Sequence, residues 1–204
     1  MKYIELSIKN LEEESKKLAE NISITFKPDI VVFIAKGSFI IGDVISRYFN
    51  TPLIECFAVR KGGKVKSIFS PLFKFIPKGI KQFLRKREME SGIHNKNKDR
   101  KVFMDRRFME KLFDAENILI VDDSVDTGNT ALEVYNYITK ISNNSNIKFA
   151  ALNYFQESKD VFKAEYYLYE NHMMSGPWSN DSKEHKIFLD MYREWKNKNA
   201  AQLE

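Results

Sequence analysis

ILIVDDSVDTGNT, residues 118–130, is the stretch that decides the fold of this 204-residue chain. Its four leading apolar residues predict a buried strand, which delivers Asp122 and Asp123 to the carboxyl edge of a sheet. Open α/β sheets bind their ligands at this edge, in the crevice outside the strand ends. We therefore expect a binding site where the strand ends.

The residues that follow the strand suit a phosphate group. They are small or hydroxylated and lead into a helix, whose free N–H groups and dipole attract a phosphate monoester. Gly128 allows close approach of the backbone, while Thr127 and Thr130 add hydroxyl donors. The carboxylates of Asp122 and Asp123 can accept hydrogen bonds from two neighbouring ribose hydroxyls. This turn is thus expected to recognise a ribose 5-phosphate.

The flanking sequence alternates strands and helices. Asn10 with Glu13 resembles a capping box at the start of the first helix. We expect helices at 11–24, 39–49, 105–113, 129–141 and 183–196, and strands at 29–35, 53–59, 117–121, 147–154 and 166–169. The strand, helix and strand within 29–59 form one βαβ unit. The sequence therefore predicts a single α/β domain over 1–204, with a mainly parallel sheet flanked by helices.

Residues 118–130 resemble the signature for 5-phosphoribosyl-1-pyrophosphate (PRPP) in type I phosphoribosyltransferases, which has two adjacent acids after an apolar strand and then a D-T-G-x-T loop. The resemblance implies the fold of that family, with PRPP and a nucleobase as substrates. It implies that Asp122 and Asp123 hold the ribose hydroxyls and that Asp126 accepts a proton from the base. The residues implied to bind the 5-phosphate are Asp126, Thr127, Gly128, Asn129 and Thr130.

An acidic pair after a buried strand also occurs in the receiver domains of response regulators. Receivers carry the pair near the start of the chain and lack the DTGNT continuation found here at residues 126–130. The simpler interpretation, that the pair only ends a buried strand, explains half of the motif. The phosphoribosyl interpretation explains all of it.

A second loop, Lys36-Gly37-Ser38, follows the earlier strand and matches the place where the family contacts pyrophosphate, often with K-G-G or R-G-G. The resemblance implies that these three residues bind pyrophosphate, that Lys36 neutralises the leaving group, and that the Ala35–Lys36 peptide is cis. It also implies Mg²⁺ as cofactor, with Asp122 and Asp123 as ligands directly or through water. Hard oxygen ligands of this kind need no cluster of histidines.

The segment 165–180 resembles the hood of the purine enzymes, particularly the xanthine-guanine type, in which an apolar residue lies a few positions before Pro-Trp. The resemblance implies base contacts from Met173, Met174 and Trp178, although these residues could equally only close the core. The lysine that reads a purine's exocyclic oxygen has no clear counterpart, because the strand at 147–154 offers Asn153 and Tyr154 instead. Because the hood pattern is present but this lysine is missing, the resemblance gives only a preference for a purine acceptor.

Residues 60–101 interrupt the alternation with fourteen Lys or Arg against three Asp or Glu, a local net charge of +11. The pattern predicts a basic, partly amphipathic insertion, longer than the mobile loop that relatives carry over the site. It could be a lid, a lid that also forms a dimer contact, or an attachment to nucleic acid or an anionic membrane. We expect the chain to form a homodimer, and we expect the insertion to act as a lid, with or without a part in the dimer contact.

Composition narrows the setting of the protein. The single cysteine, Cys56, lies in an apolar run, so no intramolecular disulfide is possible. The charged N-terminus predicts no signal peptide, and no apolar run approaches the ~20 residues of a spanning helix. We expect a cytoplasmic transferase of purine salvage. The alternative is a regulator of the same fold that senses PRPP or nucleotides and binds nucleic acid through 60–101.

Overall fold

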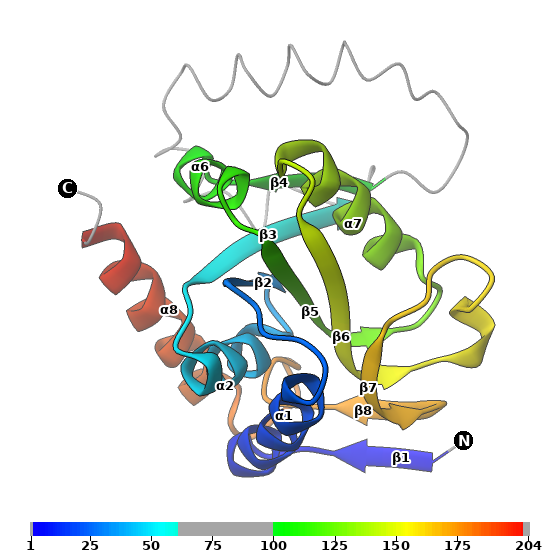
Figure 1. Cartoon of the computed structure of the whole chain (residues 1–204). Coiled ribbons are helices and arrows are strands. Elements are labelled where there is room, and N and C mark those ends of the chain that lie inside the picture. The colour runs from blue at the N-terminus through cyan, green and yellow to red at the C-terminus, as the bar shows by residue number, and fades with distance from the viewer. Residues whose placement is uncertain (1, 61–99, 202–204) are drawn as a thin grey trace.

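The computed structural model describes residues 2–60 and 100–201, without the side chains of residues 60, 200 and 201. A six-stranded sheet in the order β4-β3-β2-β5-β6-β7 forms the centre of the molecule (Figure 1). Every neighbouring pair is parallel except β3 with β4. The predicted α/β fold with a mainly parallel sheet is confirmed. The lid, dimer and nucleic-acid expectations for the basic insertion concern residues 61–99, which lie outside the described residues.

The elements alternate along the chain as the sequence predicts. In order they are β1 (Lys2–Glu5), α1 (Ile8–Ser23), β2 (Ile30–Ile34), α2 (Phe39–Phe49), β3 (Leu53–Arg60), β4 (Arg100–Met104), α6 (Arg106–Phe113), β5 (Asn117–Val125), α7 (Asn129–Ile141), β6 (Asn146–Tyr154), a short 3-10 helix (Gln156–Ser158), β7 (Tyr166–Glu170), β8 (His172–Ser175) and α8 (His185–Ala201). Helices α2 and α7 have the bounds expected from the sequence.

Helix α1 begins earlier than predicted. Ser7, rather than Asn10, is its N-cap, because the Ser7 side chain accepts a hydrogen bond from the backbone N–H of Asn10 at 3.1 Å. Two expected boundaries also move at the basic insertion. Arg60 of β3 pairs with Arg100 of β4, and Lys101 pairs with Val59, so these ends of the insertion belong to the sheet.

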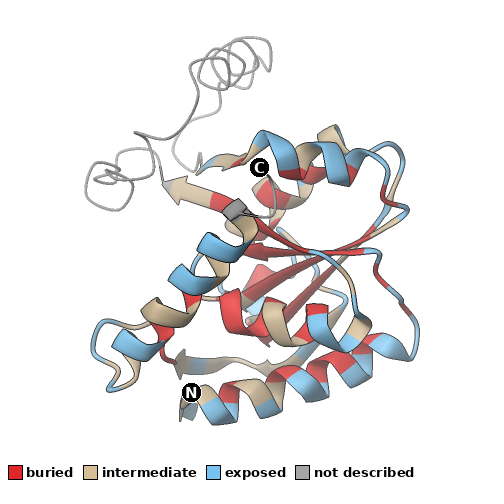
Figure 2. Ribbon diagram, turned by 90° about the vertical axis from the view of Figure 1, so that its left-hand side faces the viewer, coloured by how far each residue is buried: buried red, intermediate tan, exposed pale blue. Residues whose placement is uncertain are grey.

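Helices cover both faces of the sheet and create two cores. The residues of β2 alternate between them: Val31 and Phe33 face α1, α2 and α8, whereas Val32 faces α6 and α7. All five residues of β2 are buried, as Figure 2 shows for the strands between the helices. A strand buried on both faces is apolar throughout, which is why the run at 29–35 shows no polar alternation. Burial on both faces therefore fixes which side chains of a central strand point into each of the two cores.

A second, smaller sheet lies beside the first. Strand β1 pairs with β8 in parallel, with Tyr3 opposite Met173 and Ile4 opposite Met174. The segment 165–180, expected as a hood, is thus divided: β7 is the edge strand of the main sheet, and β8 belongs to the small one. We call this pair the β1–β8 sheet. Among the helices in the described parts of the chain, none is long and apolar enough to cross a membrane.

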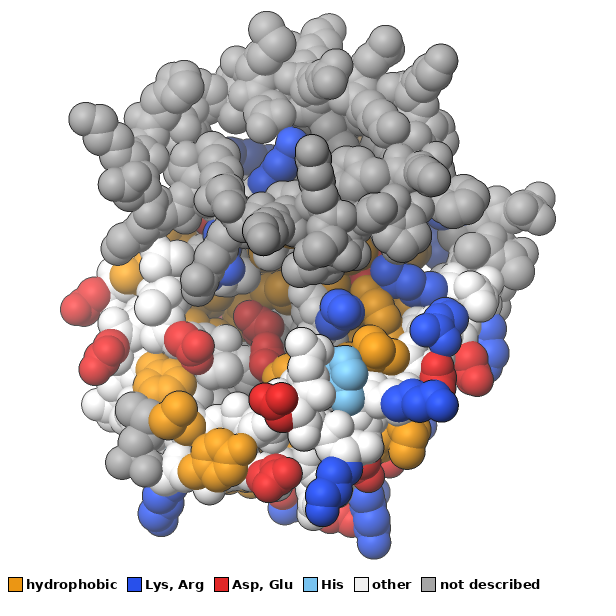
Figure 3. Space-filling view, turned by 180° about the vertical axis from the view of Figure 1, so that it is seen from behind, with side chains coloured by type: hydrophobic (Ala, Val, Ile, Leu, Met, Phe, Trp, Pro, Cys, Tyr) orange, Lys and Arg blue, Asp and Glu red, His pale blue; other side chains and the backbone are white. Residues whose placement is uncertain are grey.

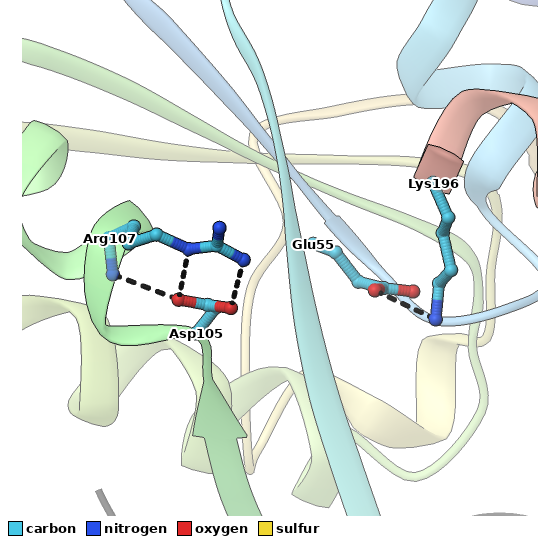
Figure 4. A network of polar contacts seen from close by, with 4 residues as sticks. All are labelled: Glu55, Asp105, Arg107 and Lys196. Atoms are coloured by element: carbon cyan, nitrogen blue, oxygen red, sulfur yellow. Dashed lines mark hydrogen bonds and ion pairs between the residues drawn. The ribbon is translucent and has the colours of Figure 1, made fainter. Parts of the chain in front are cut away.

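Helix α8 is tied to β3 by a buried glutamate. The Tyr192 hydroxyl donates to Glu55. Lys196 Nζ lies 3.1 Å from Glu55 Oε2, as Figure 4 shows. The same ammonium group lies over the rings of Tyr192 and Phe57, at 4.6 and 5.0 Å from their centroids. Burial raises the pKa of Glu55 to about 7 and outweighs the opposing positive charges of Lys196 and Lys36. Glu55 therefore titrates near neutral pH.

Figure 4 also shows how α6 begins. The Asp105 carboxylate accepts hydrogen bonds from the Arg107 backbone N–H at 3.0 Å and from its guanidinium at 3.0 and 2.8 Å. Asp105 is therefore the N-cap of α6 rather than its first residue.

The protonation of Glu55 makes stability depend on pH. Because its pKa is 4.5 in an ordinary setting and about 7 in the folded chain, its stabilising contribution is complete below pH 4.5 and is lost as pH rises through 7. The loss is on the order of 3 kcal/mol. Urea unfolding across pH 4.5–8 should show this decline, and Glu55→Gln should remove it. The exposed-site control Glu110→Gln should keep the wild-type pH profile; an unaltered profile in Glu55→Gln would contradict the assignment.

Candidate active site

Strand β5 carries the acidic pair to the carboxyl edge of the sheet. The strand is longer than its apolar run because pairing with β6 continues through Ser124 opposite Asn153 and Val125 opposite Tyr154. Asp122 is buried, and its Oδ1 accepts a hydrogen bond from the Asp123 N–H at 3.0 Å. The face of the molecule seen in Figure 3 is hollowed, and acidic side chains lie in the hollow.

Burial sets the electrostatics of the acidic pair. It raises the pKa of Asp122 well above its ordinary value, and the adjacent Asp123 carboxylate raises it further. Burial also raises the pKa of the half-buried Asp123. Two neighbouring carboxylates in this setting favour ligands that bring hydroxyl donors or positive charge.

The loop after β5 leads directly into α7. Gly128 is the N-cap with φ of 75°, and a Cβ there would lie 3.1 Å from the Phe162 nitrogen. Only glycine adopts this backbone conformation and this close packing without strain. Asp126 and Thr127 are exposed, while Asn129 Nδ2 donates to Thr127 Oγ1 at 2.9 Å. Thr130 is half-buried in the first turn of α7, where the free backbone N–H groups of a helix lie.

The loop at residues 36–38 meets the acidic pair. It follows β2, which pairs with β5, and a Cβ added to Gly37 would lie 2.9 Å from the Asp123 carboxyl carbon. The Ala35–Lys36 peptide is cis, as the family resemblance implied. Lys36 is exposed, whereas Ser38 is buried and its hydroxyl donates to the Ile34 carbonyl oxygen at 2.5 Å. The structure thus brings the two predicted loops together, with the Ser38 hydroxyl turned to the backbone.

The three residues expected to contact a base occupy different environments. Met173 is 56% exposed on the β1–β8 sheet. Met174 and Trp178 are partly buried against the core formed with α1, α2 and α8. The Trp178 ring also lies within 2.3 Å of the position that a Cβ on Gly176 would take. The side chains of Met174 and Trp178 therefore help to close the core, and Met173 is the one presented to solvent.

The two polar residues at the carboxyl end of β6, Asn153 and Tyr154, are already hydrogen-bonded. The Tyr154 hydroxyl donates to the Phe162 carbonyl oxygen at 2.8 Å. Asn153 is fully buried and bonds to Ser124 and to the backbone of His172. One further contact is not evident from the sequence: Ser124 Oγ donates to Asp126 Oδ1 at 2.6 Å. This contact could be found only from the pairing of Ser124 with Asn153, which requires the register of β5 on β6.

An acidic pair, a helix N-terminus and a lysine loop at one carboxyl edge are an arrangement suited to a phosphorylated ribose. A family model described as phosphoribosyl transferase domain matches residues 6–171, and the chain belongs to this family. It is therefore a phosphoribosyltransferase, for which the family implies PRPP and a base as substrates. No curated protein sequence matches the chain.

Solved structures agree on the fold. The purine phosphoribosyltransferase of Pyrococcus horikoshii Ot3 is 20% identical, with a TM-score of 0.58, covering 89% of this chain and 97% of its own. The xanthine-guanine-hypoxanthine phosphoribosyltransferase of Helicobacter pylori is 15% identical, with a TM-score of 0.58 and coverages of 91% and 97%. A hypothetical protein from Neisseria gonorrhoeae with bound ppGpp is 15% identical, with a TM-score of 0.60 and coverages of 93% and 97%.

The contact between the loops predicts a specific defect for Gly37→Ala. The added methyl group would displace the Asp123 carboxylate, so PRPP affinity measured by calorimetry should fall by roughly tenfold or more, equivalent to about 1.4 kcal/mol. The exposed substitution Asn21→Ala on α1 is the control and should bind PRPP as wild type does. Wild-type affinity in Gly37→Ala would show that Asp123 does not contact the ligand.

Proposed function

We propose that this phosphoribosyltransferase transfers the 5-phosphoribosyl group of PRPP to a purine base and releases pyrophosphate. The observation that carries the proposal is the approach of Gly37 to the Asp123 carboxylate. This approach gives one continuous surface to the two loops that bind pyrophosphate and ribose 5-phosphate in the family. A ligand with a phosphate at each end of a ribose would span both loops.

Each end of PRPP has a complementary group in the described residues. The ribose hydroxyls donate to the carboxylates of Asp122 and Asp123, and the 5-phosphate lies against the N-terminus of α7. The exposed ammonium group of Lys36 attracts the pyrophosphate end. These contacts orient C1 of the ribose toward the incoming base.

Mg²⁺ fits this site by the chemistry of its donors. The described residues contain no group of three or more potential metal ligands, and the acidic pair offers two hard carboxylates of the kind that Mg²⁺ takes alongside substrate phosphates. Asp122 and Asp123 would hold the ion directly or through water. When bound, the ion would supply positive charge that neutralises the departing pyrophosphate.

The transfer itself requires one bond to form and one to break. A ring nitrogen of the base attacks C1, and the bond from C1 to the pyrophosphate oxygen breaks with its electron pair leaving on the pyrophosphate. Lys36 stabilises the charge that develops there, and Asp126 accepts the proton of the attacking nitrogen. Both side chains are exposed at the edge of the sheet, where a substrate can reach them.

The preference for a purine rests on two supports. The solved structures of similar fold include a purine enzyme and a xanthine-guanine-hypoxanthine enzyme. Met173 offers an exposed thioether, which can pack against a ring. Because Asn153 and Tyr154 are already bonded, backbone groups near Met174 would read the edge of the base.

Pyrophosphate release across a panel of bases tests the acceptor. PRPP and Mg²⁺ are supplied with hypoxanthine, guanine, xanthine, adenine or a pyrimidine, and pyrophosphate is measured. Release with one or more purines supports the proposal, and release with a pyrimidine alone overturns the purine preference. PRPP binding without release favours the alternative, a sensor of PRPP or nucleotides; the local charge of +11 at residues 60–101 is the observation behind it.

Asp126→Asn separates binding from chemistry. The variant keeps a side chain of the same size but cannot accept the proton, so turnover should fall by roughly 10²–10⁴-fold while PRPP affinity stays near wild type. Asp160→Asn removes the same charge from an exposed site and serves as the control. Calorimetry with PRPP and steady-state pyrophosphate release give the two readouts. Unchanged turnover in Asp126→Asn would remove Asp126 from the mechanism.

A further inference from the structure

A buried asparagine connects the catalytic loop to the β1–β8 sheet. Asn153 lies at the carboxyl end of β6, opposite Ser124 of β5, and is fully buried. Its Nδ2 donates to Ser124 Oγ at 3.0 Å and to the His172 carbonyl oxygen at 2.9 Å. Its Oδ1 accepts from the His172 N–H at 3.1 Å. The amide thus uses both of its N–H groups and its oxygen in bonds to β5 and β8.

The backbone of β8 fixes the orientation of this amide. The N–H of His172 faces Asn153 Oδ1, and the carbonyl oxygen of His172 faces Asn153 Nδ2. Turning the amide by 180° would set N–H against N–H and oxygen against oxygen, and a buried polar group without a partner is costly. Asn153 therefore presents an N–H group, and never its oxygen, to Ser124.

The direction of the next hydrogen bond follows from the first. Since Ser124 Oγ accepts from Asn153, its own proton is available to donate, and it donates to Asp126 Oδ1 at 2.6 Å. A hydroxyl bound to a carboxylate at this distance makes a strong, charge-assisted bond. From Asn153 onward the donors therefore run in one direction, from its Nδ2 through the Ser124 hydroxyl to the Asp126 carboxylate.

This chain of bonds matters because Asp126 is otherwise an exposed carboxylate on a loop. Such a side chain can turn among several rotamers, and only some of them point an oxygen at the acceptor nitrogen. The bond from Ser124 engages Oδ1 and holds the carboxylate in one orientation, in which Oδ2 takes the proton. The anchor of that bond is the backbone of His172, the residue before Met173.

We propose that Ser124 and Asn153 are positioning residues that hold Asp126 in register with the strand β8. The inference rests on the proposed function, in which a base lies against Met173 and gives its proton to Asp126. The network places both contacts on one hydrogen-bonded unit, so a displacement of β8 by the wrong acceptor would also move the proton acceptor. Ser124 and Asn153 thereby contribute to acceptor discrimination without touching the base.

Kinetics of Ser124 variants test the positioning role. With the base that supports release in the wild type, Ser124→Ala should lower kcat by roughly tenfold to a hundredfold, the range expected for loss of a hydrogen bond to a charged group. The Kd for PRPP should stay within about twofold of wild type. Ser124→Thr, which keeps the hydroxyl, should restore most of kcat. Ser23→Ala, an exposed serine on α1, is the matched control.

A double-mutant cycle distinguishes positioning from a general structural role. In the Asp126→Asn background, Ser124→Ala should have little further effect, because the carboxylate that it orients is already gone. Wild-type kcat in Ser124→Ala would overturn the proposal, as would a loss in the Asp126→Asn background equal to that in the wild type. A Ser124→Thr variant as impaired as Ser124→Ala would also count against it.

The network can also be measured without turnover. In the folded wild type, both side-chain amide protons of Asn153 should be protected from solvent exchange in NMR spectra, and Ser124→Ala should expose one of them. Rapid exchange of both in the wild type would refute the network. If the wild type binds PRPP but releases pyrophosphate with none of the bases in the panel, the proposed function fails while the network can still be intact. The two failures are therefore distinguishable.

Discussion

The parallel pairing of β2 with β5 places both loops of the active site. Val32 lies opposite Ile120 and Phe33 opposite Val121, so the chain leaves the two strands at the same edge and Gly37 meets Asp123 there. A shift of one residue would turn every buried side chain of a strand to the opposite face. Because both faces are buried in separate cores, apolar packing away from the candidate site fixes the spacing of its polar groups.

Local sequence was sufficient for the elements that depend on local signals. The apolar run before Asp122 predicted the central part of β5, and the small residues around Gly128 predicted the loop that leads into α7. The bounds of α2 and α7 were also predicted. Strands β1, β4 and β8 were not, because each is short and carries charged or polar residues, as in KYIE and HMMS. Their partners lie elsewhere in the chain: β1 pairs with a strand that begins at His172. The length of β5 was missed for the same reason, since β6 supplies the pairing.

The candidate site shows the same division. A motif that is continuous in sequence identified the acidic pair and the α7 loop, and strand order explains why the lysine loop joins them. The environments of Glu55 and Asn153, by contrast, are formed by residues that are distant in the sequence. Tyr192 is 137 positions from Glu55, and no periodicity links them. Asn153 reads in the sequence as a polar interruption of a strand, and only the register on β5 and the position of β8 show that its amide is satisfied.

The contacts of Tyr192 and Lys196 on α8 with Glu55 bear on where the domain ends. The family match ends at residue 171, before both β8 and α8 begin. A chain cut there would leave Glu55 without Tyr192 and Lys196, expose the core that Phe188 fills, and leave β1 without its partner strand. The structural domain is thus larger than the segment that the family model matches. In this protein the C-terminal helix is a structural part of the catalytic domain.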